Sequence, residues 1–266
     1  MRNIGSRYGG VLFTVGLVSS LLVVGASPAS GADDVFCEWE VATIVGTAGD
    51  DVLTGTSGDD VIVGLKGDDV IDGLGGNDHI CGGPGNDEIN GGGGYNQLLG
   101  EGGDDLIVGG RDSDYIQGGP GNDVLKGMGG YDSIYGDNSW SCSTIKCNSD
   151  VGGDDQIFGG PGGDWLYGGP GDDVIYGEGG NDSLHGDSWS VNIHDGDDIL
   201  YGGPGKDDIF GGLGVDELYG DAGPDSLFGG GPGEELENGG AGRDTCFSGA
   251  AVACEVLLER TLNRGR

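Results

Sequence analysis

The nonapeptide GGPGNDEIN, residues 82 to 90, decides how the rest of this sequence must be interpreted. It holds four glycine or proline residues, two acids and a single side chain of the kind usually buried, Ile89. Such a composition excludes a helix and disfavours an ordinary strand. The whole chain shares this bias, since 65 of its 266 residues are glycine. Composition alone would therefore indicate disorder.

A nine-residue period argues against disorder. Counted in nines from Gly46 to Phe247, with two interruptions, the chain contains 20 units, and every unit begins with glycine. Position six is Asp in 18 units, the exceptions being Asn96 and Glu234. Position eight is Leu or Ile in 19 units and Cys246 in the last. A low-complexity disordered chain predicts no fixed apolar column, so the period indicates a repeat fold.

Each column has a physical role. Glycine at positions one and four permits positive φ, so the first six residues can form a tight half-turn. Positions seven to nine form a short strand, in which position eight points inward and its neighbours point outward. Two units then make one flattened coil of 18 residues, and successive coils stack as parallel strands about 4.8 Å apart. The predicted fold is all-β: a parallel β-roll (β-helix solenoid) of about 20 nonapeptide units with short end caps.

The acidic column indicates what stabilises such a roll. One apolar residue in nine does not offset the backbone entropy lost on ordering nine residues. The position-six carboxylates recur every 18 residues on the same edge, where bare charges would repel one another. A divalent cation between them reverses that effect. Calcium accepts six to eight oxygen ligands in flexible geometry, whereas magnesium keeps its waters, so calcium is the expected ion.

Four units resemble a known repeat: GGPGNDEIN, GGPGNDVLK, GGPGDDVIY and GGPGKDDIF are similar to the hemolysin-type, or RTX, nonapeptide G-G-x-G-x-D-x-U-x. The resemblance covers residues 46 to 247 and implies a β-roll with two rows of calcium ions. It also implies weaker or absent sites at Asn96 and Glu234. The metal ligands that it implies are Asp51, Asp60, Asp69, Asp78, Asp87, Asp105, Asp114, Asp123, Asp132, Asp155, Asp164, Asp173, Asp182, Asp198, Asp207, Asp216, Asp225 and Asp244.

The two ends differ from the repeats. Residues 1–32 combine early arginines, an apolar run and small residues, which is typical of a secretory signal peptide cleaved after Ala32, or alternatively after Ala29. A membrane anchor is the competing interpretation, but the apolar run is short for a span. We therefore expect a secreted, extracellular protein without a membrane span after cleavage. Residues 33–45 are expected to form an N-terminal cap, with Trp39 and Ile44 over the first coil, and residues 248–266 a C-terminal cap or tail.

Six cysteines follow the signal segment, an even number that favours disulfides in an exported chain. Cys142–Cys147 and Cys246–Cys254 are close in sequence and form natural pairs. Cys37–Cys81 then remains by elimination. Zinc is the alternative, but no CxxC motif or histidine cluster accompanies these cysteines.

Two units carry insertions, near residues 137–150 and 187–195, and both insertions should leave the same edge of the roll. Solvent-exposed edges tolerate insertions. The alternative is a recognition patch for glycans built from Trp140, Trp189 and His194. Asp137, Asp187 and Asp195 could add an irregular calcium site there.

Position nine changes character along the chain. It is mixed before residue 130 and afterwards aromatic, with only His185 breaking the run. Aromatic ladders of this kind stabilise neighbouring strands, and they could also bind sugar, lipid or a partner. The aromatic positions are Tyr135, Phe158, Tyr167, Tyr176, Tyr201, Phe210, Tyr219 and Phe228.

A net charge of −35 excludes a nucleic-acid partner and attracts cations. The sequence contains no G-x-S-x-G, H-E-x-x-H or phosphate-binding loop motif, so we expect no enzyme. The predicted function is that of a secreted calcium-binding repeat protein that folds on calcium and acts as a structural or surface module. The alternative is an extracellular module that binds a cell-surface glycan or protein through the insertions and the aromatic ladder.

Overall fold

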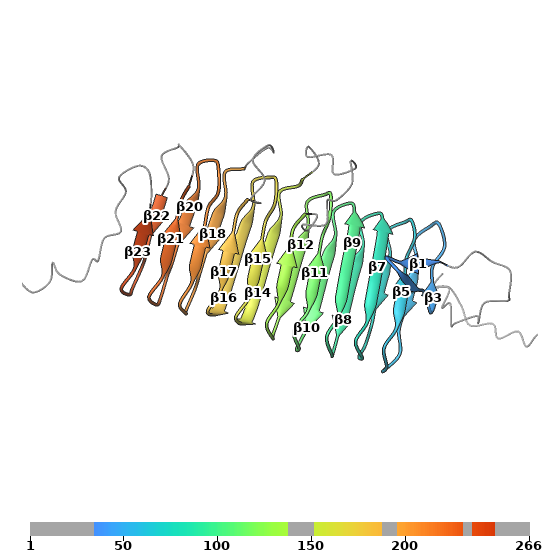
Figure 1. Cartoon of the computed structure of the whole chain (residues 1–266). Coiled ribbons are helices and arrows are strands. Elements are labelled where there is room, and N and C mark those ends of the chain that lie inside the picture. Colours follow the sequence, from blue (N-terminus) through green and yellow to red (C-terminus); the bar gives the residue numbers. More distant parts are fainter. Residues whose placement is uncertain (1–34, 138–151, 188–195, 231–235, 248–266) are drawn as a thin grey trace, which may run out of the picture.

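The computed structural model describes residues 35–137, 152–187, 196–230 and 236–247. Within these ranges the chain is an elongated parallel β-solenoid of about ten turns, and no helix occurs among them. Figure 1 shows the strands crossing the long axis of the roll, with β3 near one end and β23 at the other. The expectation of an all-β parallel β-roll is confirmed.

The strands of odd-numbered units form one ten-stranded parallel sheet. Its members are, in spatial order, β4 (Val52–Thr54), β6 (Val70–Asp72), β8 (Glu88–Gly92), β10 (Leu106–Gly110), β12 (Val124–Met128), β14 (Gln156–Gly162), β16 (Val174–Gly180), β18 (Ile199–Tyr201), β20 (Glu217–Tyr219) and β22 (Leu236–Asn238).

The strands of even-numbered units, with one cap strand, form an eleven-stranded sheet that faces the first. Its members are β3 (Ile44–Val45), β5 (Val61–Val63), β7 (His79–Pro84), β9 (Gln97–Gly102), β11 (Tyr115–Gln117), β13 (Ser133–Tyr135), β15 (Trp165–Tyr167), β17 (Ser183–His185), β19 (Asp208–Phe210), β21 (Ser226–Phe228) and β23 (Thr245–Phe247). A separate antiparallel pair consists of β1 (Phe36–Cys37) and β2 (Glu40–Val41).

The register follows the 18-residue coil, so that position eight always pairs with position eight. Leu53 lies opposite Ile71 in one sheet, and Ile62 lies opposite Ile80 in the other. The ladder continues across both insertions, where Leu125 pairs with Ile157 and Ile175 with Leu200. The insertions therefore lengthen turns without shifting any strand.

The core is one column of Leu and Ile side chains between the two sheets, as the period predicts. Each is at most 1% exposed. These residues are Leu53, Ile62, Ile71, Ile80, Ile89, Leu98, Ile107, Ile116, Leu125, Ile134, Ile157, Leu166, Ile175, Leu184, Leu200, Ile209, Leu218 and Leu227.

The prediction that glycines at positions one and four adopt positive φ is wrong for position one. The left-handed positions in the turns are two and four, not one and four: Gly83 at position two has φ 117° and Gly85 at position four has φ 151°. Gly82, at position one, is not left-handed. It must be glycine because a Cβ there would collide with the carboxylate of Asp87. Position one thus requires space, and position two requires backbone freedom.

The nineteenth unit also differs from the prediction, which placed Glu234 at position six and Leu236 in the core. The structure pairs Glu237 with Leu218 and buries Glu237 to 1% exposure, while Leu236 points outward and is 42% exposed. The unit has ten residues, and the three strand positions are set by the turn that follows at Gly239. The extra residue is therefore taken up before the strand. Glu234 itself lies outside the described residues.

The N-terminal cap is partly as expected. Ile44 packs against the end of the core column. Trp39 does not cover the first coil: it is 70% exposed, and its ring lies 6.2 Å from that of His79 on the side of the roll. Residues 1–32 and 248–266 lie outside the described residues. The part of the chain that the structure describes holds no helix that is long and apolar enough to cross a bilayer.

Candidate metal centres

The position-six aspartates form two columns, one along each edge of the roll. Those of odd units precede strands of the ten-stranded sheet, and those of even units precede strands of the eleven-stranded sheet. The first column is Asp51, Asp69, Asp87, Asp105, Asp123, Asp155, Asp173, Asp198 and Asp216; the second is Asp60, Asp78, Asp114, Asp132, Asp164, Asp182, Asp207, Asp225 and Asp244.

One oxygen of each carboxylate holds neighbouring turns together. The backbone N–H of Asp69 donates to Oδ1 of Asp87 at 2.8 Å, and the N–H of Asp87 donates to Oδ1 of Asp105 at 2.8 Å. The same contact bridges the first insertion, where Asp123 N–H donates to Oδ1 of Asp155 at 2.8 Å. The fold thus uses Oδ1 as a turn acceptor, which leaves Oδ2 for another purpose.

The second oxygen, Oδ2, is buried without a hydrogen-bond partner along most of both columns. A buried carboxylate oxygen without a donor is costly, because it has lost its water and gained nothing in return. Such oxygens recur at Asp69, Asp78, Asp87, Asp105, Asp114, Asp123, Asp132, Asp155, Asp164, Asp173, Asp182, Asp198, Asp207 and Asp225. The same unpartnered oxygen in turn after turn is the arrangement that a bound cation would satisfy.

The position-one glycines form the cradle around each Oδ2. A Cβ built on Gly177 would lie 2.7 Å from Oδ2 of Asp182 and 2.6 Å from the carbonyl oxygen of Gly202 in the next turn. The same Cβ on Gly73 would lie 2.6 Å from both Asp78 Oδ2 and the Gly91 carbonyl oxygen. A carboxylate and a carbonyl oxygen therefore converge on one point beside each of these glycines.

Burial raises the pKa of these carboxyl groups, because removal from water disfavours the charged form. Desolvation is the largest cause that raises the pKa of Asp173 to about 10 and that of Asp155 and Asp198 to about 9. Backbone N–H donors oppose the shift, and neighbouring carboxylates add to it. In the middle of the roll, burial raises the pKa of Asp105 to about 8 and that of Asp123 to about 7.

The donor set fits calcium. All groups that converge are oxygens, from carboxylates and carbonyls, which are the ligands of a hard divalent cation. Glycine turns supply the carbonyls without side-chain obstruction, and a bound dication would lower the pKa of each raised carboxyl. The expected ligands therefore lie where a calcium ion could reach both a carboxylate and the neighbouring turn.

The first coil is different, because threonine donors satisfy the carboxylate oxygens that lack a partner in the interior coils. Oδ2 of Asp51 accepts hydrogen bonds from the backbone N–H of Thr47 at 2.5 Å and from its hydroxyl at 2.8 Å. Thr56 donates to Oδ2 of Asp60 in the same way, at 2.6 and 2.9 Å. These two predicted ligands already have donors, so they suit a metal less well than the interior carboxylates.

Asn96 also departs from the column, as expected. Its Oδ1 accepts the N–H of Asp78 at 3.0 Å, so its Nδ2 takes the place of Oδ2 and donates to the Gly94 carbonyl oxygen at 3.1 Å. An N–H donor in the cradle repels a cation.

Sequence reasoning missed the role of position five. Its side chains accept backbone N–H groups from the following turn: Asp50 accepts from Asp68 at 3.1 Å, and Asn86 accepts from Asp104 at 3.0 Å. The side chain at position six therefore accepts a backbone N–H from the preceding coil, and the side chain at position five accepts one from the following coil. The frequency of Asp and Asn at position five was a signal that could have revealed this second ladder.

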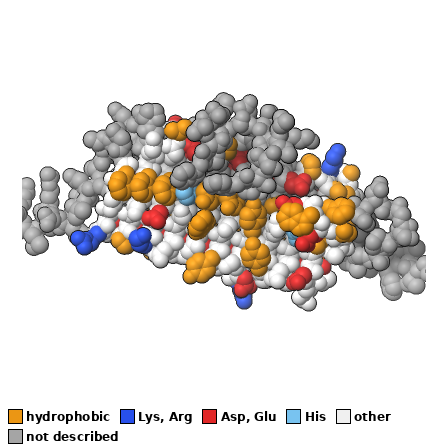
Figure 2. Space-filling view, in the orientation of Figure 1, with side chains coloured by type: hydrophobic (Ala, Val, Ile, Leu, Met, Phe, Trp, Pro, Cys, Tyr) orange, Lys and Arg blue, Asp and Glu red, His pale blue; other side chains and the backbone are white. Residues whose placement is uncertain are grey.

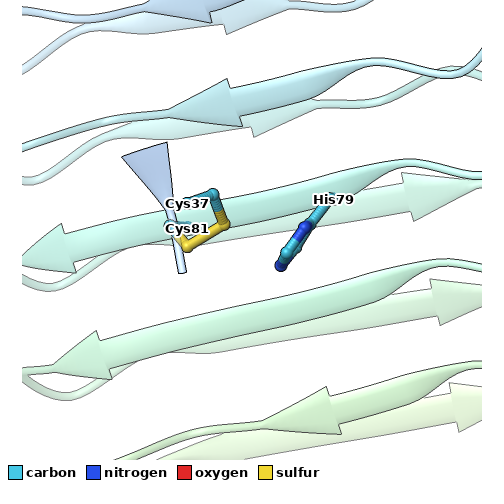
Figure 3. A group of neighbouring side chains, drawn as sticks. All are labelled: Cys37, His79 and Cys81. Carbon is cyan, nitrogen blue, oxygen red and sulfur yellow. A yellow bond between two sulfur atoms is a disulfide. The ribbon is translucent and has the colours of Figure 1, made fainter. Parts of the chain in front are cut away.

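The predicted Cys37–Cys81 disulfide is present, with the Cα atoms 5.6 Å apart, and it ties β1 to β7 (Figure 3). His79 lies beside it, but the sulfurs bonded to each other are not available as thiolate ligands, which agrees with a disulfide rather than zinc. Cys246 is also disulfide-bonded. Its predicted partner Cys254, the pair Cys142–Cys147, and Trp140, Trp189, His194 and Asp195 lie outside the described residues.

Position nine forms two stacked ladders. In the ten-stranded sheet Tyr176 stacks on Phe158 and on Tyr201, with centroids 5.0 Å apart in each case. The sequence predicts that His185 interrupts the run in the other sheet. Instead, its ring stacks between Tyr167 at 4.5 Å and Phe210 at 4.7 Å. Burial lowers the pKa of His185 to about 4, so the ring is neutral at pH 7.

Comparison with known proteins gives one family. The model of the RTX calcium-binding nonapeptide repeat (4 copies) matches residues 45–80, 54–89, 82–116, 117–140, 151–188, 194–218 and 211–231, which together make up more than half of the chain. No curated protein matches the chain.

Proposed function

The chain belongs to the RTX calcium-binding nonapeptide repeat family, and from that membership we propose that it is a secreted, non-catalytic protein that folds on calcium and acts as a structural or surface module. The repeats of this family bind calcium ions at multiple sites.

The observation that carries this proposal is the pair of buried carboxylate columns whose Oδ2 atoms have no donor. The interior position-six aspartates supply the carboxylates, and the turn carbonyls beside the position-one glycines supply further oxygens. Asp51 and Asp60 bind weakly or not at all, because threonine already satisfies them. Since the site does not exist in the unfolded chain, the free energy of calcium binding contributes directly to folding.

Circular dichroism and size-exclusion chromatography of the purified chain, with calcium and with EDTA, test this directly. We expect a compact β protein in calcium and an expanded, largely unordered chain in EDTA, with magnesium restoring little. A chain that is equally compact in EDTA and takes up no calcium in a titration would contradict the proposal.

Secretion rests on residues 1–32, with their charged, apolar and small-residue segments, and on the disulfide bond of Cys37, which suits an oxidising compartment. Expression in a secreting host followed by N-terminal sequencing should give a mature protein that begins at Asp33. A protein retained in the cell with Met1 intact would exclude this route.

The aromatic ladders support a second role, binding of a cell-surface glycan or protein. They place continuous rows of rings on the outer faces of both sheets, and Figure 2 shows rows of hydrophobic side chains across the visible face. The rings cover one another's faces, so the rows present ring edges as an apolar strip to a partner. A glycan array probed with the calcium-loaded chain, with a Tyr201→Ala variant for the ladder and with a Trp140→Ala/Trp189→Ala variant for the insertions, tests this role; absence of binding by the unmodified chain removes it.

A further inference from the structure

Two acids at position two, Asp137 and Asp187, differ in backbone conformation from the residue at that position in every regular interior turn of the roll. Where position two is not glycine in a regular interior turn, its backbone is left-handed, as at Leu74 (φ 71°) and Met128 (φ 77°), and both of these side chains are about half exposed. Asp137 and Asp187, which begin the two interrupted turns, are not left-handed. Their carboxylates are buried, at 6% and 8% exposure. The backbone change turns a side chain that would face solvent toward the edge of the roll.

The next coil decides whether each buried carboxylate finds a donor. Asp187 faces the turn that contains Leu213, and its Oδ2 accepts the Leu213 N–H at 2.9 Å. Asp137 faces the corresponding turn one coil after its own, where the residue at the same position is Pro170. Proline has no N–H to donate. The backbone N–H of Gly153 faces the Asp137 carboxylate, but both carboxylate oxygens are buried and neither has a hydrogen-bond partner at normal distance and angle.

Asp137 is aimed into an oxygen-rich corner. A Cβ built on Gly152 would lie 2.6 Å from Asp137 Oδ2 and would also touch the Pro170 carbonyl oxygen, and a Cβ on Gly169 would lie 2.8 Å from the same Oδ2. Gly136, the residue before Asp137, borders the cradle of Asp155, whose own Oδ2 is buried without a partner. The turn thus brings two unpartnered carboxylates together where a regular turn has one.

We propose that Asp137 is an additional calcium ligand, forming with Asp155 and the Pro170 carbonyl a site that binds calcium more tightly than the regular sites of the roll. The inference rests on the proposed calcium function and deepens it. Calcium affinity rises with the number of charged ligands and the rigidity of the site, and the fold here supplies one more carboxylate on a fixed backbone. This ion binds first and orders the centre of the roll, between β13 and β15 (Figure 1).

Two substitutions test the site. Asp137→Asn removes the extra charge but keeps the shape. Pro170→Leu keeps both carboxylates and offers Asp137 the N–H that Leu213 gives to Asp187; the sequence GGLG of residues 211–214 shows that leucine is accepted at this position. Asp187→Asn controls for an interrupted turn whose acid already has a donor. Asp221→Asn controls for the same Gly-Asp pair in a regular turn, where Asp221 is exposed and left-handed at φ 63°.

Calcium titration calorimetry of the full chain is the readout. We expect the unmodified protein, Asp187→Asn and Asp221→Asn to show one tight binding step ahead of the others. That step should weaken roughly tenfold or more in Asp137→Asn and in Pro170→Leu. Thermal melting at increasing calcium concentration adds a second readout: the melting temperature of Asp137→Asn should fall further below that of the unmodified chain as calcium rises, and the difference should then level off, because stabilisation by a ligand grows with its concentration relative to Kd.

The outcomes separate the two proposals. If the unmodified chain takes up calcium with no distinct tight step, or if Asp137→Asn titrates like Asp221→Asn, the special site does not exist while the general function stands. If the unmodified chain takes up no calcium at all, the proposed function fails as well. A melting temperature of Asp137→Asn that lies below that of the unmodified chain by the same amount at every calcium concentration would assign Asp137 a purely structural role and overturn the inference.

Discussion

The first coil and the interior coils differ in what surrounds the buried Oδ2 atom of the position-six carboxylate. In the first coil, the hydroxyl and N–H of Thr47 and Thr56 satisfy the inward oxygens of Asp51 and Asp60. In the interior, the equivalent oxygens of residues such as Asp105 and Asp182 have no protein donor. The backbone ladder and the apolar column are the same in both regions. The difference therefore isolates the contribution of the cation.

Backbone conformation explains why threonine does not stand at position two in the interior coils. Regular interior turns place position two in the left-handed region, which β-branched residues avoid, and their position-six Oδ2 atoms have no side-chain donor. Thr47 and Thr56 are not left-handed. In a chain built entirely of such units threonine would satisfy every inward oxygen, whereas most turns of this chain leave that oxygen without a protein donor.

The largest effect is expected from filling an interior cradle. Gly177→Ala would place a methyl group between Asp182 Oδ2 and the Gly202 carbonyl oxygen, so we expect loss of one calcium ion in addition to an overpacking cost of about 1–3 kcal/mol. Gly179→Ala, in the same unit, is the control, because its Cβ meets nothing within 4 Å. Gly55→Ala in the first coil should show the steric cost without the loss of calcium. Calcium-dependent melting measures all three, and equal effects of Gly177→Ala and Gly179→Ala would contradict the cradle.

The response to pH should be of opposite sign with and without calcium. Burial raises the pKa of the interior carboxyls, from about 6 at Asp87 and Asp225 to about 10 at Asp173, above the usual value near 3.8. In EDTA the protonated groups favour folding; this contribution is complete below about pH 3.8 and is lost as the pH rises from about 6 to 10. The metal-free chain should therefore be more ordered at pH 5 than at pH 9, as followed by circular dichroism.

With calcium the order reverses, because the ion competes with protons for the same oxygens. Binding should tighten between about pH 6 and pH 9 and release protons, which calorimetry in buffers of different ionisation enthalpy detects. Calcium affinity that does not change over this range would show that the interior carboxyls do not bind the ion.

Exchanging a carboxylate for an amide should separate the two regions by the number of ions bound. Asp182→Asn replaces a buried, partnerless oxygen with an N–H donor, so it should cost one bound calcium. Asp60→Asn should leave the calcium count unchanged, since Thr56 already serves that oxygen. The reciprocal change, Asn96→Asp, should add one ion. Equilibrium dialysis counts the ions, and a lower count in Asp60→Asn would mean that the first coil is not metal-independent.

The smallest effect concerns the position-nine ladder. Tyr176→Ala removes two stacking contacts, with Phe158 and Tyr201, and should cost about 1–3 kcal/mol, at roughly 0.5–1.5 kcal/mol for each contact. Asn90→Ala, at the same position nearer the first coil, should change the stability by less than about 0.5 kcal/mol. Denaturant unfolding in saturating calcium compares the two. Equal costs would mean that the rings do not stabilise the strands.

Much of the candidate site follows from position in the repeat. The period alone predicted that position-six acids would line both edges, because residues 18 apart must stack, and Asp69 does lie next to Asp87 in the next coil. It could not predict that Oδ1 would be taken by the backbone and only Oδ2 left free of donors. That division depends on the exact orientation of the turn amides, which no spacing rule contains.

Local irregularities were the hardest to predict. Counting forward from Gly229 places Leu236 in the core, but the ladder with Leu218 places Glu237 there, because strand pairing is set from the following turn. Asp137 and Asp187 look equivalent in sequence, each after a glycine at the start of an insertion. They differ because one faces Pro170 and the other faces Leu213, residues in a different coil.

The nine-residue period by itself determined the two sheets, the inward column of Leu and Ile, and the edges along which acids gather, since alternation along a strand and stacking of equal coils leave no other arrangement. Only the tertiary structure decided which carboxylate oxygens are satisfied by the protein, which position must be glycine for space rather than for φ, and which buried acid lacks a donor. Those outcomes depend on what the neighbouring coil presents within hydrogen-bonding distance. A sequence repeat specifies which residues meet, but not which of their atoms remain unpaired.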